Sequence, residues 1–356
     1  MTAMHDPDPT SAPLNLRSDN VTGVAPEILD AILRANHGTA TSYGADELTT
    51  GLGDRFSEVF GKSCAVQPLG TGTATNALAL SLLTPPWGAI LCSAVSHVHD
   101  SECGAAELFT GGAKVTPLPE THGKLLPETL EERLERAGWG RTSEVQPAVL
   151  SIAQATERGT VYRPDEIAAL TAIARRHGLK AHLDGARFGN AVAALGCAPA
   201  DLTWRAGVDV LSFGGTKNGC LAAEAIVMFD ESLAEPLRFR ARKTGHVFSK
   251  MRFVSAQLEA YVEDGLWLRL AAHANAMADR LARGLAPIDG AELLHPVEIN
   301  EIFMILPKAA QDALRRDGFG FYDRGQGEVR LVTAFDTSPD RIDAFIASAR
   351  RHADTG

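Results

Sequence analysis

A single lysine, Lys217, stands in the Gly-rich stretch LSFGGTKNG, residues 211–219. A nucleotide-binding P-loop needs a glycine just before its lysine and a hydroxyl residue just after it. Thr216 precedes this lysine and Asn218 follows it, so the P-loop match is poor. A lysine in an apolar, Gly-flanked setting can instead form an imine with a carbonyl compound. We therefore expect Lys217 to be a catalytic nucleophile, with the glycines before it leaving room for a ring.

Asp184 ends a strand-like segment in HLDGAR, and Arg187 follows three residues later. A lone Asp at the end of a strand often caps the next helix. Its alternative role is to hold a proton on a heteroaromatic nitrogen, which turns the ring into an electron sink. Both roles stay open for Asp184 on these residues alone.

The segment SAVSHVHDSEC, residues 93–103, carries two histidines in alternation, as on one face of a strand, with acidic residues nearby. Two histidines without a third ligand at suitable spacing make a weak metal site. A single histidine that stacks on an aromatic ligand, or acts as an acid or base, fits the end of a strand better. We expect His97 to have that role and expect no metal.

The turn GTGTATN, residues 70–76, follows a strand-like segment and opens a helical pattern. It nearly matches the dinucleotide-binding G-x-G-x-x-G, but Thr75 is too bulky for the third glycine. Backbone N–H groups and the dipole of a helix N-terminus favour an anion. We expect Gly72 and Thr73 to hold a phosphate, and the alternative is a simple tight turn.

Seven short, continuously apolar segments alternate with helical patterns in the first two thirds of the chain. This arrangement predicts an α/β fold with a mainly parallel seven-stranded sheet, covered on both faces, with the ligand beyond the carboxyl ends of the strands. The predicted strands are residues 65–69, 89–93, 114–118, 148–153, 180–184, 209–213 and 224–229.

The pattern changes after residue 231, where helices around 252–261 and 266–285 precede two strand-like segments and a final helix from Pro339. We expect a smaller C-terminal α+β domain there. The predicted organisation is a flexible tail (1–13), a large ligand-binding domain (14–240) and a small domain (241–356).

The composition is that of an ordinary soluble globular protein, with 356 residues, 45% hydrophobic and 22% charged. A net charge of −10 argues against a nucleic-acid or anionic-membrane surface. The first residues carry prolines and acidic side chains without an apolar run, unlike a signal peptide. Five scattered cysteines without a C-x-x-C pair look mostly like small core residues and indicate a reduced, cytoplasmic location.

A phosphate turn, a histidine, an aspartate with an arginine, and then a lysine are, in this order, the parts of a pyridoxal 5'-phosphate (PLP) site. With these residues in place, the sequence resembles the L-threonine aldolases of the low-specificity type, which include phenylserine-cleaving enzymes. They are fold-type I PLP enzymes of the β-eliminating lyase group. The segments that carry the resemblance are LRSDNVTG, SYGADELTTGL, GTGTATN, SHVHDSECGA, QATERGTVY, HLDGARFGNA, SFGGTKNG, RKTGHVFSKMR and VRLVTAFD.

The resemblance implies a role for each candidate residue around the cofactor. Lys217 would bind PLP covalently, and Asp184 would pair with the pyridine nitrogen. His97 would stack on the ring, and Arg187 would contact its phenolic oxygen. The phosphate would lie against the turn of residues 72–73.

The resemblance also implies contacts beyond the cofactor ring. Arg252 would reach the phosphate from a neighbouring subunit, which implies a homodimer or homotetramer with active sites at the interface. Ser18 and Arg330 would clamp the carboxylate of an amino-acid substrate, since a desolvated carboxylate needs charge-assisted hydrogen bonds. A surface arginine on an edge strand is the alternative for Arg330.

The sequence departs from many relatives near the expected substrate. Glu157 and Ala334 stand where a histidine is common, and HVFSK (246–250) replaces a Gly-rich loop. Glu157 could be the base for a substrate hydroxyl or only a structural partner of Arg158. These departures leave the identity of the acid/base residue open.

The expected reaction is retro-aldol cleavage of an L-β-hydroxy-α-amino acid, such as L-threonine, L-allo-threonine or phenylserine, to glycine and an aldehyde. Another PLP-dependent amino-acid lyase or aminotransferase of the same fold is the alternative. A non-catalytic, nucleotide-binding α/β protein is a rival from a different class, and the two failed nucleotide motifs argue against it.

Overall fold

The structure is a computed structural model that describes residues 13–353, so all but the last residue of the expected tail lies outside the described part of the chain. Its larger sheet has seven strands: β1 (Ala65–Leu69), β2 (Gly88–Ser93), β3 (Lys114–Leu118), β4 (Gln146–Ala153), β5 (Lys180–Gly185), β6 (Val210–Gly214) and β7 (Glu224–Met228). Their order is β1-β7-β6-β5-β4-β2-β3. Only β7 runs antiparallel to its neighbours, whereas β6, β5, β4, β2 and β3 pair in parallel. The predicted seven-stranded, mainly parallel sheet is confirmed.

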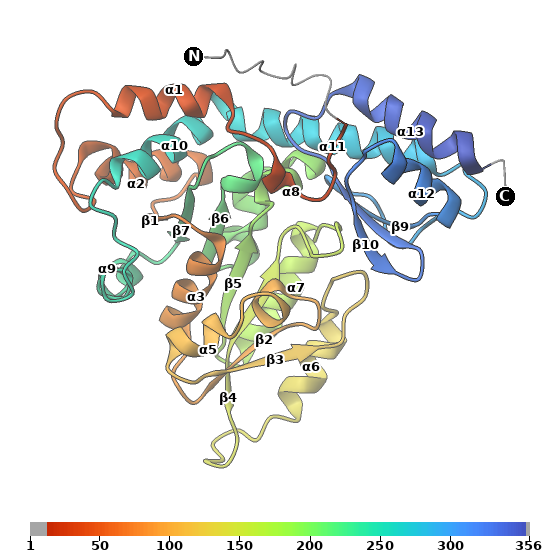
Figure 1. Cartoon of the computed structure of the whole chain (residues 1–356). Coiled ribbons are helices and arrows are strands. Elements are labelled where there is room, and N and C mark those ends of the chain that lie inside the picture. The colour runs from red at the N-terminus through yellow and green to blue at the C-terminus, as the bar shows by residue number, and fades with distance from the viewer. Residues whose placement is uncertain (1–12, 354–356) are drawn as a thin grey trace.

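Helices connect these strands and continue beyond them (Figure 1). Proline occupies the first position of the helices at 127–135 and 164–176, where its missing N–H costs nothing. In the part of the chain that the structure describes, no helix combines the length and the apolar character that a membrane crossing needs. The α-helices are α1 (Pro26–Ala35), α2 (Glu47–Phe60), α3 (Gly72–Leu83), α4 (His97–Asp100), α5 (Ala105–Thr110), α6 (Pro127–Glu135), α7 (Pro164–Arg176), α8 (Phe188–Leu195), α9 (Ala234–Lys243), α10 (Arg252–Val262), α11 (Leu266–Leu285), α12 (Lys308–Arg316) and α13 (Pro339–Ala353).

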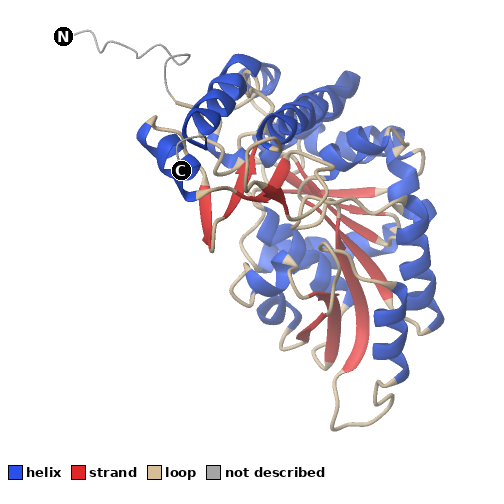
Figure 2. Cartoon of the chain, turned by 90° about the vertical axis from the view of Figure 1, so that its right-hand side faces the viewer, coloured by secondary structure: helices blue, strands red, loops and turns tan. Residues whose placement is uncertain are grey.

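Helices cover both faces of the large sheet (Figure 2). Side chains of β2 alternate between the two faces, because successive residues of a strand point to opposite sides. Ile90 packs in one apolar cluster with residues of α3, α5 and α9, and Leu91 packs in the other with residues of α2, α6, α7, α8 and α10. Burial on both faces explains why the strands read as continuous apolar runs.

A second sheet lies in the C-terminal part of the chain, with strands β8 (Glu292–Leu293), β9 (Glu301–Ile305), β10 (Tyr322–Gly325) and β11 (Glu328–Val332). The sheet is antiparallel, in the order β10-β11-β9-β8. It has four strands, whereas the sequence predicted two. The two strands that were missed are the edges, and their exposed side chains give no apolar pattern.

The small sheet has its own apolar core. Leu16 from the start of the chain packs in this core, and α11 joins the two parts, with Trp267 in the large core and Met277 in the small one. The division of the chain at residue 240 stays a prediction.

Candidate active site

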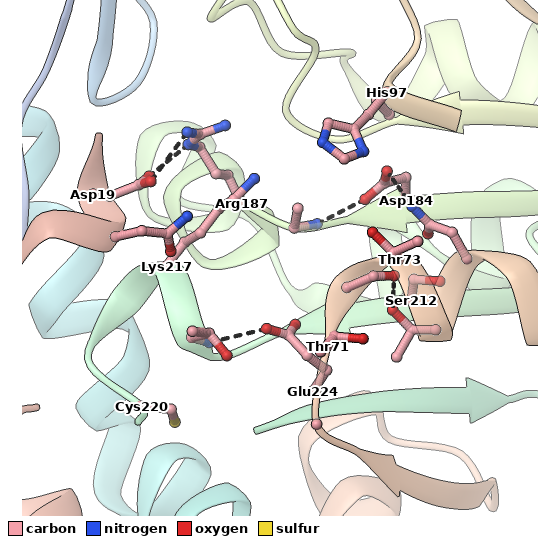
Figure 3. Close-up of a pocket in the computed structure, with 18 of the residues that line it drawn as sticks. Asp19, Thr71, Thr73, His97, Asp184, Arg187, Ser212, Lys217, Cys220 and Glu224 are labelled. Carbon is pink, nitrogen blue, oxygen red and sulfur yellow. Dashed lines mark hydrogen bonds and ion pairs between the residues drawn. The ribbon is translucent and has the colours of Figure 1, made fainter. Parts of the chain in front are cut away.

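A cavity of about 490 Å³ lies at the carboxyl ends of β4, β5 and β6, where the fold predicts a ligand (Figure 3). It brings together six of the nine residues to which the resemblance gives a contact with cofactor or substrate, and the other three do not line it. The six are Gly72, Thr73, His97, Asp184, Arg187 and Lys217, and the three are Ser18, Arg252 and Arg330. Glu157, the possible base, also lines the cavity.

Lys217 enters the cavity from the 3-10 turn η4 (Thr216–Asn218), directly after β6. The neighbouring Asn218 fixes this turn, because its buried Nδ2 donates to Tyr261 Oη at 2.7 Å and to the Trp267 carbonyl oxygen at 2.8 Å. The lysine backbone is therefore held by the aromatic core of α10 and α11.

The two glycines before the lysine, Gly214 and Gly215, are required for a different reason from the one expected. A Cβ atom on Gly214 would lie 2.6 Å from the carbonyl oxygen of Ala186, and one on Gly215 would lie 2.6 Å from that of Ala223. These glycines allow neighbouring backbone segments to pack closely against them. The expectation that they leave room for a ring was wrong.

Asp184, the second-last residue of β5, is a buried carboxylate with both oxygens in hydrogen bonds. Oδ1 accepts from the Ala186 N–H at 3.0 Å, and Oδ2 accepts from Asn76 Nδ2 at 2.8 Å. The same Asn76 Nδ2 donates to Glu102 Oε1 at 2.8 Å, and that oxygen lies 2.8 Å from His97 Nδ1. A continuous polar chain thus joins the aspartate to the histidine. The sequence reasoning missed Asn76, and it considered the acidic residues near His97 only as metal ligands.

His97 begins the short helix α4. The alternation of the two histidines indicated a strand, and that prediction was wrong. His99 is therefore exposed while His97 lines the cavity. The hydrogen bond to Glu102 raises the pKa of His97 above its ordinary value, against the effect of burial. Among residues 13–353, no three His, Cys, Asp or Glu side chains form a cluster that could hold a metal ion.

The turn before α3 places a helix N-terminus at the cavity. Thr71 Oγ1 accepts from the Ala74 N–H at 3.3 Å and caps the helix. The first N–H groups of a helix have no partner within it, and Gly72 and Thr73, the first two residues of this helix, line the cavity. A Cβ on Gly72 would meet no atom within 4 Å, so the space beside it is open.

Arg187 is held by two buried carboxylates. Its Nε lies 2.7 Å from Asp19 Oδ2, and its Nη1 lies 3.1 Å from Glu301 Oε2. Burial acts to raise the pKa of Asp19, but the charges of Arg187 and Lys217 outweigh it, so the pKa lies below its ordinary value. The guanidinium is thereby fixed at the cavity wall.

Ser18 and Arg330 lie on neighbouring backbone beside the cavity. Ser18 Oγ accepts from the Asn20 N–H at 3.1 Å and caps the 3-10 turn η1 (Asp19–Val21). Arg330 Nη2 donates to the Arg17 carbonyl oxygen at 3.0 Å, and its buried Nε has no hydrogen-bond partner among the described residues. Burial lowers the pKa of Arg330.

Arg252 is the predicted site residue with the least connection to the cavity. Its Nε donates to the carbonyl oxygen of Ala35 at 3.0 Å, and its guanidinium lies over the ring of Phe253. Within this one chain, the Arg252 side chain is therefore bound to the C-terminal end of α1.

Two acidic side chains at the cavity have strongly shifted acidities. Burial raises the pKa of Glu157 to about 7, and burial raises the pKa of Glu224 to about 7. Glu224 Oε1 accepts from the Thr216 N–H at 3.3 Å, next to the lysine. The sequence reasoning missed Glu224, although an acidic residue within the apolar strand EAIVMF is an available signal.

The residues at this cavity fit PLP by the chemistry of their donors. A helix N-terminus with threonine hydroxyls suits a phosphate, and a buried carboxylate suits a protonated ring nitrogen. A lysine lies at the same cavity, with a histidine ring on its wall. A cavity of about 490 Å³ is within the range of cofactor sites. Fold and site together define a fold-type I PLP enzyme.

Comparisons with known proteins agree with this class. The family model of the beta-eliminating lyases matches residues 15–309. The low specificity L-threonine aldolase of Pseudomonas sp. (strain NCIMB 10558) is 44% identical over 94% of this chain and 96% of its own length. The enzyme of the same name from Pseudomonas aeruginosa is 43% identical over 91% and 94%. A solved threonine aldolase from Leishmania major has a TM-score of 0.89 at 29% identity and covers 96% of this chain and 100% of that one. The chain belongs to the beta-eliminating lyase family and, within it, to the low-specificity L-threonine aldolases.

Proposed function

We propose that this chain is a PLP-dependent lyase that cleaves L-threonine, L-allo-threonine and related L-β-hydroxy-α-amino acids, phenylserine among them, to glycine and an aldehyde. The observation that carries the proposal is the cavity at the strand ends, which is lined by Lys217, Asp184 and His97. The similarity of the chain to L-threonine aldolases supports it. When bound, PLP supplies an electron-accepting ring that stabilises negative charge on the α carbon of the substrate.

Six residues at the cavity would hold the cofactor. Lys217 Nζ would bind its aldehyde carbon, and the Asp184 carboxylate would keep a proton on the ring nitrogen. His97 would lie against the ring, and Arg187 would contact the phenolic oxygen. The N–H groups at residues 72–73 would bind the phosphate.

Ser18 and Arg330 bind the substrate carboxylate in this proposal. The buried Arg330 Nε, which has no hydrogen-bond partner within residues 13–353, supports it, because an arginine whose donors are desolvated gains strongly from a carboxylate. A fixed carboxylate and a fixed phosphate would hold the Cα–Cβ bond in the orientation from which it breaks, which favours aldol cleavage over transamination or racemisation.

A second copy of the chain would complete the site. Leu221 lines the cavity and yet is 59% exposed, and Phe239, 71% exposed, lines a second cavity of about 770 Å³ together with Tyr43. Exposed apolar side chains around a site are typical of a surface that another subunit covers. We infer a homodimer or homotetramer in which Arg252 reaches a partner's phosphate site. Light scattering would give the subunit count, and a monomer would contradict this inference.

The described cysteines are all free thiols, and Cys64, Cys92 and Cys220 are buried. Free thiols are typical of a reducing compartment, which supports a cytoplasmic location.

Reduction with borohydride followed by peptide mapping tests the cofactor proposal. The expected result is a yellow protein whose cofactor is fixed by reduction to the peptide that contains Lys217. A Lys217→Ala variant should lack the absorbance of the bound cofactor and should not be labelled. Labelling at another lysine, or a wild-type protein that binds no cofactor, would overturn the proposed site.

Aldehyde release tests the substrate range. L-threonine, L-allo-threonine and phenylserine should each yield an aldehyde. If only an α-keto acid formed from them, the protein would belong to another class of PLP enzymes.

A further inference from the structure

Glu157 lies in the turn that follows β4, and this turn is closed by hydrogen bonds between its own residues. The Thr156 N–H donates to the Thr160 carbonyl oxygen at 2.9 Å, and the hydroxyls of these two threonines lie 2.8 Å apart. In the sheet, β4 lies between β5, which carries Asp184, and β2, which precedes His97. Glu157 therefore follows the strand that lies between these two. It lines the same cavity as these two residues.

The two carboxylate oxygens of Glu157 have different surroundings. Oε1 accepts from the backbone N–H of His97 at 2.7 Å, which fixes the direction of the side chain. Oε2 is buried and has no hydrogen-bond partner in the part of the chain that the structure describes. An unmade hydrogen bond on a buried polar atom costs free energy, so such atoms call for an explanation. A ligand in the cavity would supply the missing partner.

Glu157 is not the structural partner of Arg158. The Arg158 guanidinium lies over the ring of Phe303, 5.8 Å from its centroid. The groups whose charges act on Glu157 are Asp184 on β5 and His97 on α4, and Glu157 acts in turn on Cys92 and Tyr162.

The acidity of the carboxyl follows from these surroundings. Burial raises the pKa of Glu157 to about 7, the charge of Asp184 adds to this effect, and the His97 N–H opposes it. A group with a pKa near the working pH can both accept and return a proton.

We propose that Glu157 is the catalytic residue that exchanges the proton of the substrate's β-hydroxyl, with Oε2 as the accepting atom. In cleavage, the hydroxyl proton passes to Oε2, the electron pair of the O–H bond forms the carbonyl of the aldehyde, and the Cα–Cβ bond breaks. Its electron pair stays on the α carbon, where a proton completes glycine, so no further reactant is needed. This inference rests on the proposed function.

The test compares Glu157→Gln with a matched control, Glu107→Gln. Glutamine keeps an oxygen that accepts from the His97 N–H but cannot take up a proton. Glu107 also has a buried carboxylate oxygen for which the described residues offer no hydrogen-bond partner, but it does not line the cavity. Thermal unfolding of both variants establishes that they are folded.

Two reactions of the holoenzyme separate a catalytic from a structural role. Cleavage of L-threonine needs a base for the hydroxyl, whereas exchange of the α proton of glycine with deuterated water does not, because glycine has no hydroxyl. We expect Glu157→Gln to lose about 10²- to 10⁴-fold in kcat for cleavage, with glycine exchange unchanged, and Glu107→Gln to keep both. Full cleavage by Glu157→Gln, or an equal loss of both reactions, would overturn the proposal.

A spectroscopic titration gives a readout that is independent of turnover. In infrared difference spectra against Glu157→Gln, the band of a protonated carboxyl should disappear as the pH rises through about 7. A Glu157 carboxyl that is already ionised at about pH 5, near the ordinary range for glutamate, would contradict the proposal. A wild-type enzyme that exchanges glycine protons but releases no aldehyde from any substrate would instead contradict the proposed function.

Discussion

Arg187 Nε lies 2.7 Å from Asp19 Oδ2, and this buried ion pair ties the first described turn of the chain to the end of β5. The two residues are 168 positions apart in the sequence. Asn300 Nδ2, from the residue just before β9 of the small sheet, adds a hydrogen bond to the same Asp19 oxygen at 3.2 Å. The pair therefore joins the N-terminal segment, the large sheet and the small sheet at the wall of the cavity.

Removal of the Asp19 carboxylate should be strongly destabilising. Asp19→Ala leaves the Arg187 charge buried and short of a partner, which costs about 3–5 kcal/mol in the free energy of unfolding. Urea unfolding measures the change. Asp343→Ala, which removes an exposed ion pair with Arg280, is the control and should have little effect. Equal effects of the two substitutions would contradict the assigned role of Asp19.

Asn76 should contribute to cofactor affinity through Asp184. Asn76→Ala removes the hydrogen bond to Asp184 Oδ2. Because hydrogen bonds to charged groups are strong, we expect the variant to bind PLP about ten- to hundred-fold more weakly. Titration of the cofactor-free protein with PLP, followed by absorbance, measures the dissociation constant. Asn275→Ala removes an amide that pairs with Asn190 outside the cavity and should leave PLP affinity unchanged. The prediction fails if both variants bind PLP as the wild type does.

Glu224 should make the cofactor-free protein less stable as the pH rises toward neutrality. Burial raises the folded-state pKa of Glu224 from 4.5 to about 7, so between these values the folded chain keeps a proton that the unfolded chain has released. Stability then falls with rising pH, by at most about 1.4 kcal/mol per pH unit from this group. Below 4.5 and above about 7 the group contributes no slope.

Glu224→Gln removes this contribution and should gain stability relative to the wild type between about pH 5 and about pH 7. Urea unfolding across this range measures the difference. The slope should shrink without vanishing, because Glu157 titrates in the same window. The exposed Glu235→Gln is the control, and a parallel pH dependence of wild type and Glu224→Gln would contradict the prediction.

The sheet and the residues at its strand ends could be predicted from the sequence because their signals are local. Buried strands such as β2 appear as continuous apolar runs, and Asp184 and Lys217 stand directly at or after such runs. The edge strands β8 and β10 have exposed side chains and carry no such signal.

The partners of the site residues could not be predicted, because they depend on contacts between distant parts of the chain. Asn76 reaches Asp184 across 108 positions, and no local pattern records such a pair. His182 lies in the segment HLDGAR without a local signal of its role, yet its ring nitrogens lie 2.9 Å from Ser151 Oγ and 2.9 Å from Ser212 Oγ. Burial lowers the pKa of His182 to about 4, and this neutral histidine links the three adjacent strands β4, β5 and β6.

Product analysis tests the central claim most directly. Purified protein with PLP is incubated with L-threonine, and glycine and acetaldehyde are both quantified, with Lys217→Ala as the control. We expect the wild type to release equal amounts of glycine and acetaldehyde and the variant to release neither. Threonine that is consumed without glycine, or glycine and acetaldehyde released at the wild-type rate by Lys217→Ala, would contradict it.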